Sequence, residues 1–199
     1  MIIRILTATL ALFAWSAVSA FAEDVVEVTG GTFKYPLTIE VTSGSKKIPM
    51  KLTGAAMRKK AIFNVYTIGS YIQADARVTS AEELASADVL KQLHLVMERT
   101  VSGKEMATAF HDAIRANYPT EFSEDLDKFM ELMRAQTAEK GDHVWITHIP
   151  GVGIHVNLVG KKAETIRNPK FSKAVWDIYL GPKNVGEAVK KGLTARLDK

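Results

Sequence analysis

Alternating apolar and polar positions predict β-strands in the first third of the chain. The alternation covers ranges 25–28, 37–41 and 48–52, which turn sequences at 29–32 and 42–45 separate. Range 61–72 differs, because apolar residues occupy both of its faces. We expect this range to form a strand that other elements cover on both sides.

Helical periodicity follows in the middle of the chain. Ranges 80–83 (Ser-Ala-Glu-Glu) and 102–105 (Ser-Gly-Lys-Glu) have the form of capping boxes, in which a serine side chain caps the first turn of a helix. We expect the first helix to end near Ala87 and the second to end before Pro119. Apolar residues at helical spacing mark the second helix and a third one after it: Met106, Phe110, Ala113 and Ile114, then Phe122, Leu126, Phe129, Met130 and Met133. We interpret both stripes as core.

The rest of the chain returns to strands and then to helices. Strands are predicted over ranges 90–97, 142–148, 154–159 and 163–166. One helix is predicted from Asn168, with proline in its first turn, to Gly181, and a last one over 184–196. This order of elements predicts an α+β fold, in which helices pack on one side of an antiparallel sheet.

An apolar segment follows a short basic start at the N-terminus. Range 5–18 is almost uninterruptedly apolar, and Ala20-Phe21-Ala22 fits the A-x-A pattern of a cleavage site. We therefore predict a secretory signal peptide over residues 1–22, cleaved after Ala22, a single domain over 23–199 and a periplasmic location. A membrane anchor is the alternative, but the apolar run is shorter than the ~20 residues that a spanning helix needs, so no membrane span is expected.

Charge and residue content exclude several classes of function. The net charge is +4, and lysines and arginines are spread among acidic residues, which disfavours nucleic acid as a partner. The chain has no cysteine, which excludes thiolate metal sites and thiol catalysis. No H-x-x-x-H pair occurs; His148 and His155 flank a turn and could meet across a hairpin, although satisfied strand histidines are the commoner outcome. We expect neither metal nor cofactor, and the oligomeric state stays open.

The candidate functional residues lie in range 52–72. A Gly-Ala-Ala turn is predicted at 54–56, and Arg58 and the apolar strand that carries Tyr66 follow it. A guanidinium presents a planar fork of donors that suits a carboxylate, and a neighbouring apolar strand suits an oily tail. The combination indicates a site for an amphipathic anion. The alternative is a solvated Arg58 in a basic turn, with Tyr66 in the core.

Three ordered segments carry a family resemblance. The first segment joins range 52–58, which is similar to a G-x-G-x-R turn, to range 63–72, which is similar to the V-Y-x-x-G-x-Y-L strand after that turn. The second segment is 101–105, and the third is 171–181 with 190–197. With these segments the chain resembles the chalcone isomerase-like family, in particular its short secreted bacterial branch. The resemblance implies an open-faced β-sandwich, a large antiparallel sheet with helices packed on one face, and a ligand cleft near Arg58.

The resemblance also implies roles for individual residues. In the plant isomerases the arginine that matches Arg58 holds the substrate's phenolate, and a tyrosine and an asparagine order the cleft; those two positions are Met106 and Ala113 here. Related plant fatty-acid binders hold a carboxylate with an arginine and a tyrosine, which match Arg58 and Tyr66.

We therefore expect a cleft that binds a small amphipathic anion, a fatty acid or an aromatic acid, without catalysis. Arg58 and Tyr66 anchor the anion in this hypothesis, and Met106 and Ala113 line the cleft. Two alternatives stay open. One is an intramolecular lyase that acts on a chalcone-like phenol with Arg58 as its catalytic group, and the other is an interaction module with no small ligand.

Overall fold

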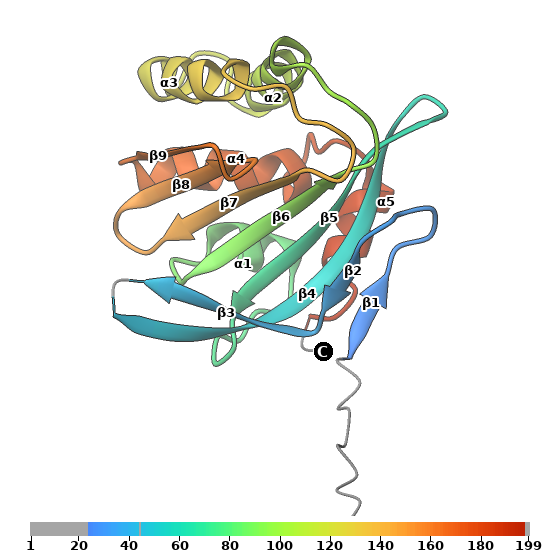
Figure 1. Ribbon diagram of the computed structural model, residues 1–199. Helices are drawn as coiled ribbons and strands as arrows, with labels where there is room; N and C mark the ends of the chain where they lie inside the picture. The colour runs from blue at the N-terminus through green and yellow to red at the C-terminus, as the bar shows by residue number, and fades with distance from the viewer. Residues whose placement is uncertain (1–23, 44, 198–199) are drawn as a thin grey trace, which may run out of the picture.

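Seven antiparallel strands, hydrogen-bonded in chain order, form the curved sheet at the centre of the molecule (Figure 1). The computed structural model describes residues 24–43 and 45–197, so the predicted signal peptide lies outside the described residues. The strands of this sheet are β3 (Thr38–Ser43), β4 (Lys46–Lys60), β5 (Phe63–Gln73), β6 (Lys91–Met97), β7 (His143–Ile149), β8 (Gly153–Leu158) and β9 (Lys162–Ile166). A separate two-stranded hairpin pairs β1 (Val25–Glu27) with β2 (Lys34–Pro36).

Helices cover one face of the sheet, as the order of elements predicted (Figure 1). They are α1 (Ala81–Ser86), α2 (Gly103–Asn117), α3 (Ser123–Arg134), α4 (Pro169–Leu180) and α5 (Glu187–Leu193). In the part of the chain that the structure describes, no helix is long and apolar enough to cross a membrane.

Side chains cap three helices where the sequence predicted them. Ser80 Oγ accepts from the Glu83 amide at 3.1 Å, Ser102 Oγ accepts from the Glu105 amide at 3.2 Å, and Asn168 Oδ1 accepts from two amides at the start of α4. The last helix is shorter than predicted. Asn184 Oδ1 accepts from the Gly186 amide at 2.8 Å, and this local turn delays the helix to Glu187.

The segment 101–138, which contains α2 and α3, has its two ends bridged by backbone hydrogen bonds. Val101 and Ala138 exchange two backbone hydrogen bonds, of 2.8 and 3.0 Å, between the end of β6 and the start of β7. This bridge holds the two ends of the helical segment together, while β6 and β7 pair directly with each other.

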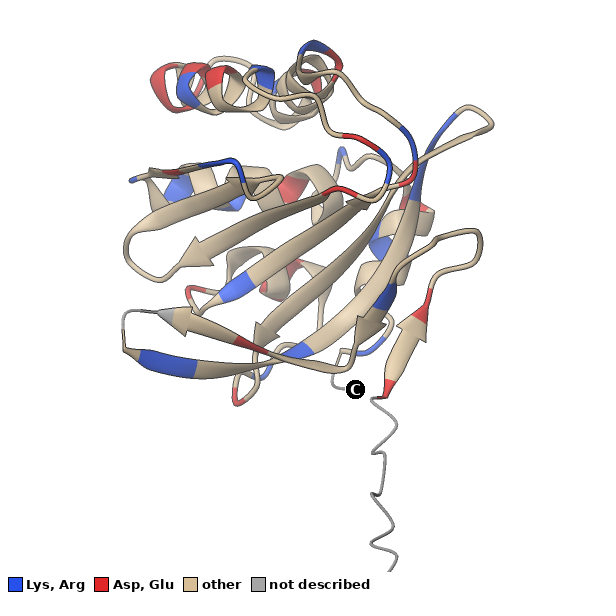
Figure 2. Ribbon diagram, in the orientation of Figure 1, with Lys and Arg blue, Asp and Glu red and all other residues tan. Residues whose placement is uncertain are grey.

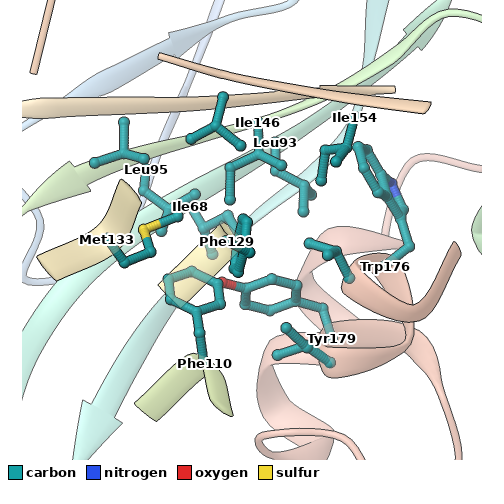
Figure 3. Close-up of a cluster of buried hydrophobic side chains, with 14 of the residues drawn as sticks. Ile68, Leu93, Leu95, Phe110, Phe129, Met133, Ile146, Ile154, Trp176 and Tyr179 are labelled. Atoms are coloured by element: carbon teal, nitrogen blue, oxygen red, sulfur yellow. The ribbon is translucent and has the colours of Figure 1, made fainter. Parts of the chain in front are cut away.

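The main core lies between the sheet and the helices (Figure 3). The sheet contributes Ile68, Leu93, Leu95, Ile146 and Ile154, and the helices contribute Phe110, Phe129, Met133, Trp176 and Tyr179. Phe110 of α2 meets Phe129 of α3 edge to face, with ring centroids 5.3 Å apart. The Met and Phe stripes of the two helices are therefore core, as their spacing predicted.

The β1–β2 hairpin covers part of the opposite face. Tyr35 is fully buried against Gly69 of β5, where an added Cβ would lie 2.4 Å from the tyrosine ring. Its hydroxyl donates to Thr67 Oγ1 at 2.9 Å. Because Ile68 and Ile72 face the helices, β5 is covered on both sides over residues 65–72. The prediction for range 61–72 is wrong at its start, since residues 61–63 are exposed and the first two of them form a turn.

The two histidines beside the β7–β8 turn point away from each other. His148 Nδ1 lies 2.8 Å from Ser172 Oγ on α4, whereas His155 Nδ1 lies 2.9 Å from Thr165 Oγ1 on β9. The register pairs His148 with Ile154 and places His155 opposite Thr147, so the two rings do not meet across the hairpin.

A histidine pair on the sheet face opposite the helices, in which His94 is buried and His143 half-buried, makes stability depend on pH. His94 Nε2 lies 2.7 Å from His143 Nδ1, and burial, aided by the charge that His143 can carry, lowers the pKa of His94 from 6.5 to about 3. As pH falls between these values, the unfolded chain takes up a proton that the native chain does not. The free energy of unfolding therefore decreases with falling pH, by up to about 1.4 kcal/mol per pH unit.

Replacement of this imidazole should reduce the acid sensitivity. We expect His94→Gln to lose less stability than wild type between about pH 7 and pH 4, as measured by urea unfolding at both values. His111→Gln, on the exposed side of α2, is the control for loss of a histidine. Equal losses in wild type and His94→Gln would contradict the assignment.

Candidate ligand cleft

A mostly apolar cleft opens between the sheet and helices α2 and α4. It contains about 680 Å³ of space outside protein atoms, including its open mouth. The apolar lining consists of Val65, Leu95, Met97, Val101, Met106, Ala109, Phe110, Val144, Ile178 and Val185. The polar lining consists of Arg58, Lys60, Tyr66, Arg99, Glu105 and Tyr179. The cleft is thus an oily space with a small set of polar groups, the usual composition of a small-molecule site.

Two tyrosine hydroxyls meet in the lining. Tyr66 Oη on β5 lies 3.1 Å from Tyr179 Oη on α4. Burial is the main cause that raises the pKa of both phenols above the usual range, and the charge of Arg58 opposes this effect in each case. Both phenols are therefore neutral near pH 7. One hydroxyl donates to the other, so the pair keeps one proton that it can donate to a ligand.

The strand register brings Arg58 to this pair. Arg58 of β4 stands directly opposite Tyr66 of β5, and directly opposed residues of an antiparallel ladder project from the same face. The register shifts between Arg58 and Lys59, where the guanidinium donates to the Lys59 carbonyl oxygen. Arg58 is half-buried, as a residue at the edge of a cleft should be.

An ion pair lies in the lining near the start of α2. The Arg99 guanidinium binds both carboxylate oxygens of Glu105, and its Nη1 lies 3.3 Å from Oε2. The hydrogen bond from Arg99 is the main cause that lowers the pKa of Glu105. Glu105 thus neutralises Arg99, and no carboxylate among the described residues forms an ion pair with Arg58.

The predicted Gly-Ala-Ala turn is wrong. β4 runs without interruption from Lys46 to Lys60, and Gly54 lies at a bulge within it, where φ is +154°. A Cβ on Gly54 would lie 2.0 Å from the Gly192 carbonyl oxygen of α5. The glycine therefore permits backbone contact between a strand and a helix, instead of a change in chain direction.

The structure places the four predicted site residues unequally. Arg58, Tyr66 and Met106 all line the cleft. Ala113 lies two turns further along α2, outside the lining, and packs partly buried against the main core. Their role in binding stays a prediction.

No sequence pattern singles out Tyr179, because it lies at helical spacing from the apolar residues Phe171, Val175 and Ile178 of the helix predicted from Asn168. The signal for it in the sequence is its residue type alone, since a buried tyrosine hydroxyl needs a hydrogen-bond partner that an apolar stripe does not provide.

The geometry defines an α+β protein with a ligand-type cleft between an antiparallel sheet and its helical layer. A family model described as chalcone isomerase-like matches residues 28–194, so the chain belongs to the chalcone isomerase-like family. The sequence matches none of the curated proteins.

A solved structure supports the fold. The crystal structure of an Arabidopsis thaliana fatty-acid binding protein is similar to this chain with a TM-score of 0.68 and 16% sequence identity. The match covers 86% of this chain and 96% of the plant chain. At this identity the similarity establishes the shared fold, and with it the predicted architecture of a large antiparallel sheet with helices on one face.

Proposed function

We propose that this protein binds a small amphipathic anion, a fatty acid or an aromatic acid, in the cleft beside Arg58, and that it does so without catalysis. The observation that carries the proposal is the arrangement of the lining: Arg58 and the Tyr66–Tyr179 hydroxyl pair beside an otherwise apolar space. A carboxylate placed there meets one cation and one hydroxyl donor, and its tail meets methyl, methylene and ring groups.

Energetics favour an anion with an apolar tail over a fully polar one. A guanidinium binds a carboxylate through charge-assisted hydrogen bonds, which contribute about 1.5–3 kcal/mol where water is excluded. Each methylene buried against the apolar lining adds roughly 0.8 kcal/mol. Neither part suffices for tight binding alone, because association carries its own entropic cost.

The plant structural neighbour supports binding, since its own description is that of a fatty-acid binding protein. Lack of catalysis is supported by α2, where Met106 presents a thioether to the cleft at the position that the family resemblance assigns to an ordering tyrosine. A thioether has no proton to donate to a reacting phenolate. We accordingly expect the protein to leave the spontaneous cyclisation rate of a chalcone unchanged, as followed by absorbance.

The experiment that tests binding uses delipidated protein and a panel of straight-chain fatty acids and aromatic acids. Isothermal titration calorimetry should give saturable binding to acids with apolar tails, and weaker binding to the corresponding alcohols, which lack the charge. Native mass spectrometry of protein purified without refolding should show a bound acid. A panel without saturable binding would overturn the proposal.

The hydroxyl pair should contribute less than the cation. We expect Tyr66→Phe to weaken decanoate binding by about three- to tenfold, because a neutral hydrogen bond contributes about 0.5–1.5 kcal/mol. Tyr118→Phe is a matched control, since that hydroxyl donates to Asp177 and lies outside the lining. Equal affinities in Tyr66→Phe and wild type would remove Tyr66 from the proposed anchor.

We also propose that the protein works in the periplasm, on the strength of the leader-like sequence over residues 1–22. Fractionation of the native host should recover the protein with periplasmic markers. N-terminal sequencing should begin at Glu23. A mature chain that retains Met1 in the cytoplasmic fraction would contradict this location.

A further inference from the structure

The hairpin between β4 and β5 ends in an exposed apolar tip. Ile62 and Phe63 are 85% and 63% exposed, and of the other large apolar residues described only Val25, at 39%, is exposed as well. The last pair between β5 and β6 is Tyr66 with Met97, so the tip extends past the neighbouring strand (Figure 1). Two adjacent large apolar side chains on a projecting turn are thus mostly exposed to solvent.

The turn at this tip is not built from residues that turn geometry favours. Ala61 has φ of +54°, a conformation in which hairpins normally use glycine or asparagine. Ile62 follows it and is 85% exposed. The need to reverse the chain therefore does not explain why apolar residues occupy this turn. Contact with another surface would explain them.

Positive charge lies on the β4 side of the tip. Arg58, Lys59 and Lys60 precede it on β4, and the blue segment at the end of this strand marks them in Figure 2. Between Glu40 and Asp75 the sequence has no acidic residue at all. The whole β4–β5 hairpin is thus cationic, with an apolar point at its end. This pairing matches an anionic lipid surface, where phosphates attract lysines and the acyl region takes up apolar side chains.

The tip and the cleft share residues. Lys60 flanks the tip and also lines the cleft, and Arg58 lies on the same strand two residues before it. A surface that takes up the tip therefore lies close to the polar groups of the cleft.

We propose that the β4–β5 tip docks this protein on the surface of an anionic lipid bilayer, with Ile62 and Phe63 inserted and Lys59 and Lys60 against the headgroups. The inference goes beyond the proposed function, because docking requires no ligand in the cleft. It places the cleft next to a surface rich in amphipathic molecules.

Vesicle co-sedimentation tests the proposal. The protein is mixed with phosphatidylcholine vesicles that either contain or lack phosphatidylglycerol. Wild type should sediment with the anionic vesicles and much less with the neutral ones, and added salt should reduce the bound fraction. Any contribution of residues 1–22 is the same in every variant, so the comparison of variants isolates the tip.

Two substitutions separate the apolar and the charged parts. Ile62→Ser with Phe63→Ser should lower the partition coefficient by at least about tenfold, because both side chains lose apolar burial. Lys59→Glu should lower it by about tenfold through charge reversal at the surface. Circular dichroism and the urea midpoint should stay at wild-type values, because the substituted side chains are exposed.

Matched controls lie elsewhere on the same surface. Val25→Ser removes an exposed apolar side chain from β1, and Lys46→Glu makes the same charge change at the other end of β4. Neither should change partitioning. The proposal is overturned if wild type sediments with neither kind of vesicle or if the serine variant has the partition coefficient of wild type. It is also overturned if Lys46→Glu lowers the partition coefficient as much as Lys59→Glu does. A wild type that is dimeric in solution, together with a serine variant that is monomeric, would instead assign the tip to self-association.

Discussion

Replacement of Arg58 with glutamine is expected to weaken decanoate binding by about ten- to hundredfold. The cation lies opposite Tyr66 in the β4–β5 ladder, and its charge acts on both phenols of the cleft. A charged hydrogen bond to a carboxylate contributes about 1.5–3 kcal/mol, and 1.4 kcal/mol corresponds to a tenfold change in affinity. Isothermal titration calorimetry at low and moderate salt measures the effect.

Two variants make this result specific. Lys59→Gln removes the same charge from the next residue, which is exposed and lies outside the cleft lining, so its affinity should stay within about twofold of wild type. Arg58→Lys keeps the charge but loses the planar fork, so its affinity should fall between those of wild type and Arg58→Gln. If Lys59→Gln and Arg58→Gln weaken binding equally, the cation acts through the general field of the hairpin and not as an anchor.

The second large effect concerns stability. Gly54→Ala should lower the free energy of unfolding by about 3 kcal/mol or more, because two penalties add. The new Cβ would lie 2.0 Å from the Gly192 carbonyl oxygen, and φ of +154° is a conformation that an alanine rarely adopts. Since α5 packs on β4 at this place, the variant should also separate the helix from the strand. Urea unfolding measures the loss.

Gly160→Ala is the control for backbone strain alone. Gly160 also has positive φ, +67°, but no atom lies within 4 Å of a Cβ built there. Gly160→Ala should therefore lower the free energy of unfolding by only about 1 kcal/mol. A Gly54→Ala variant that is no less stable than Gly160→Ala would show that α5 can withdraw from the strand at little cost.

Much of the fold was predictable from local patterns. The three side-chain caps, the stripes of α2 and α3, and the two-faced burial of β5 each follow from the spacing of residues within one element. The error at Gly54–Ala56 has a clear origin. A glycine next to two alanines looks like a turn in sequence, whereas its use here depends on α5, about 140 residues later in the chain.

The candidate site was predictable only in part. Arg58 and Tyr66 were selected from one segment, but their opposition depends on a register that a bulge at Gly54 sets, and no local pattern reveals that bulge. Tyr179 comes from a distant helix and meets Tyr66 only in three dimensions. The prediction for Ala113 rests on a count along α2, and the structure places this residue two turns beyond Met106 and outside the lining.

The bridge between Val101 and Ala138 separates the lining residues of one closed segment from those of the rest of the chain. The closed segment supplies Met106, Ala109 and Phe110 to the apolar lining, whereas the proposed anion-binding groups come from outside it. Because β6 and β7 pair with each other outside this segment, exchange of residues 101–138 would reshape the apolar lining and leave Arg58, Tyr66 and Tyr179 in place. The new segment must keep a carboxylate at position 105, since Glu105 neutralises Arg99 in the lining. Under the proposed function, a chimaera with a foreign segment 101–138 should therefore change selectivity for tail length more than selectivity for charge.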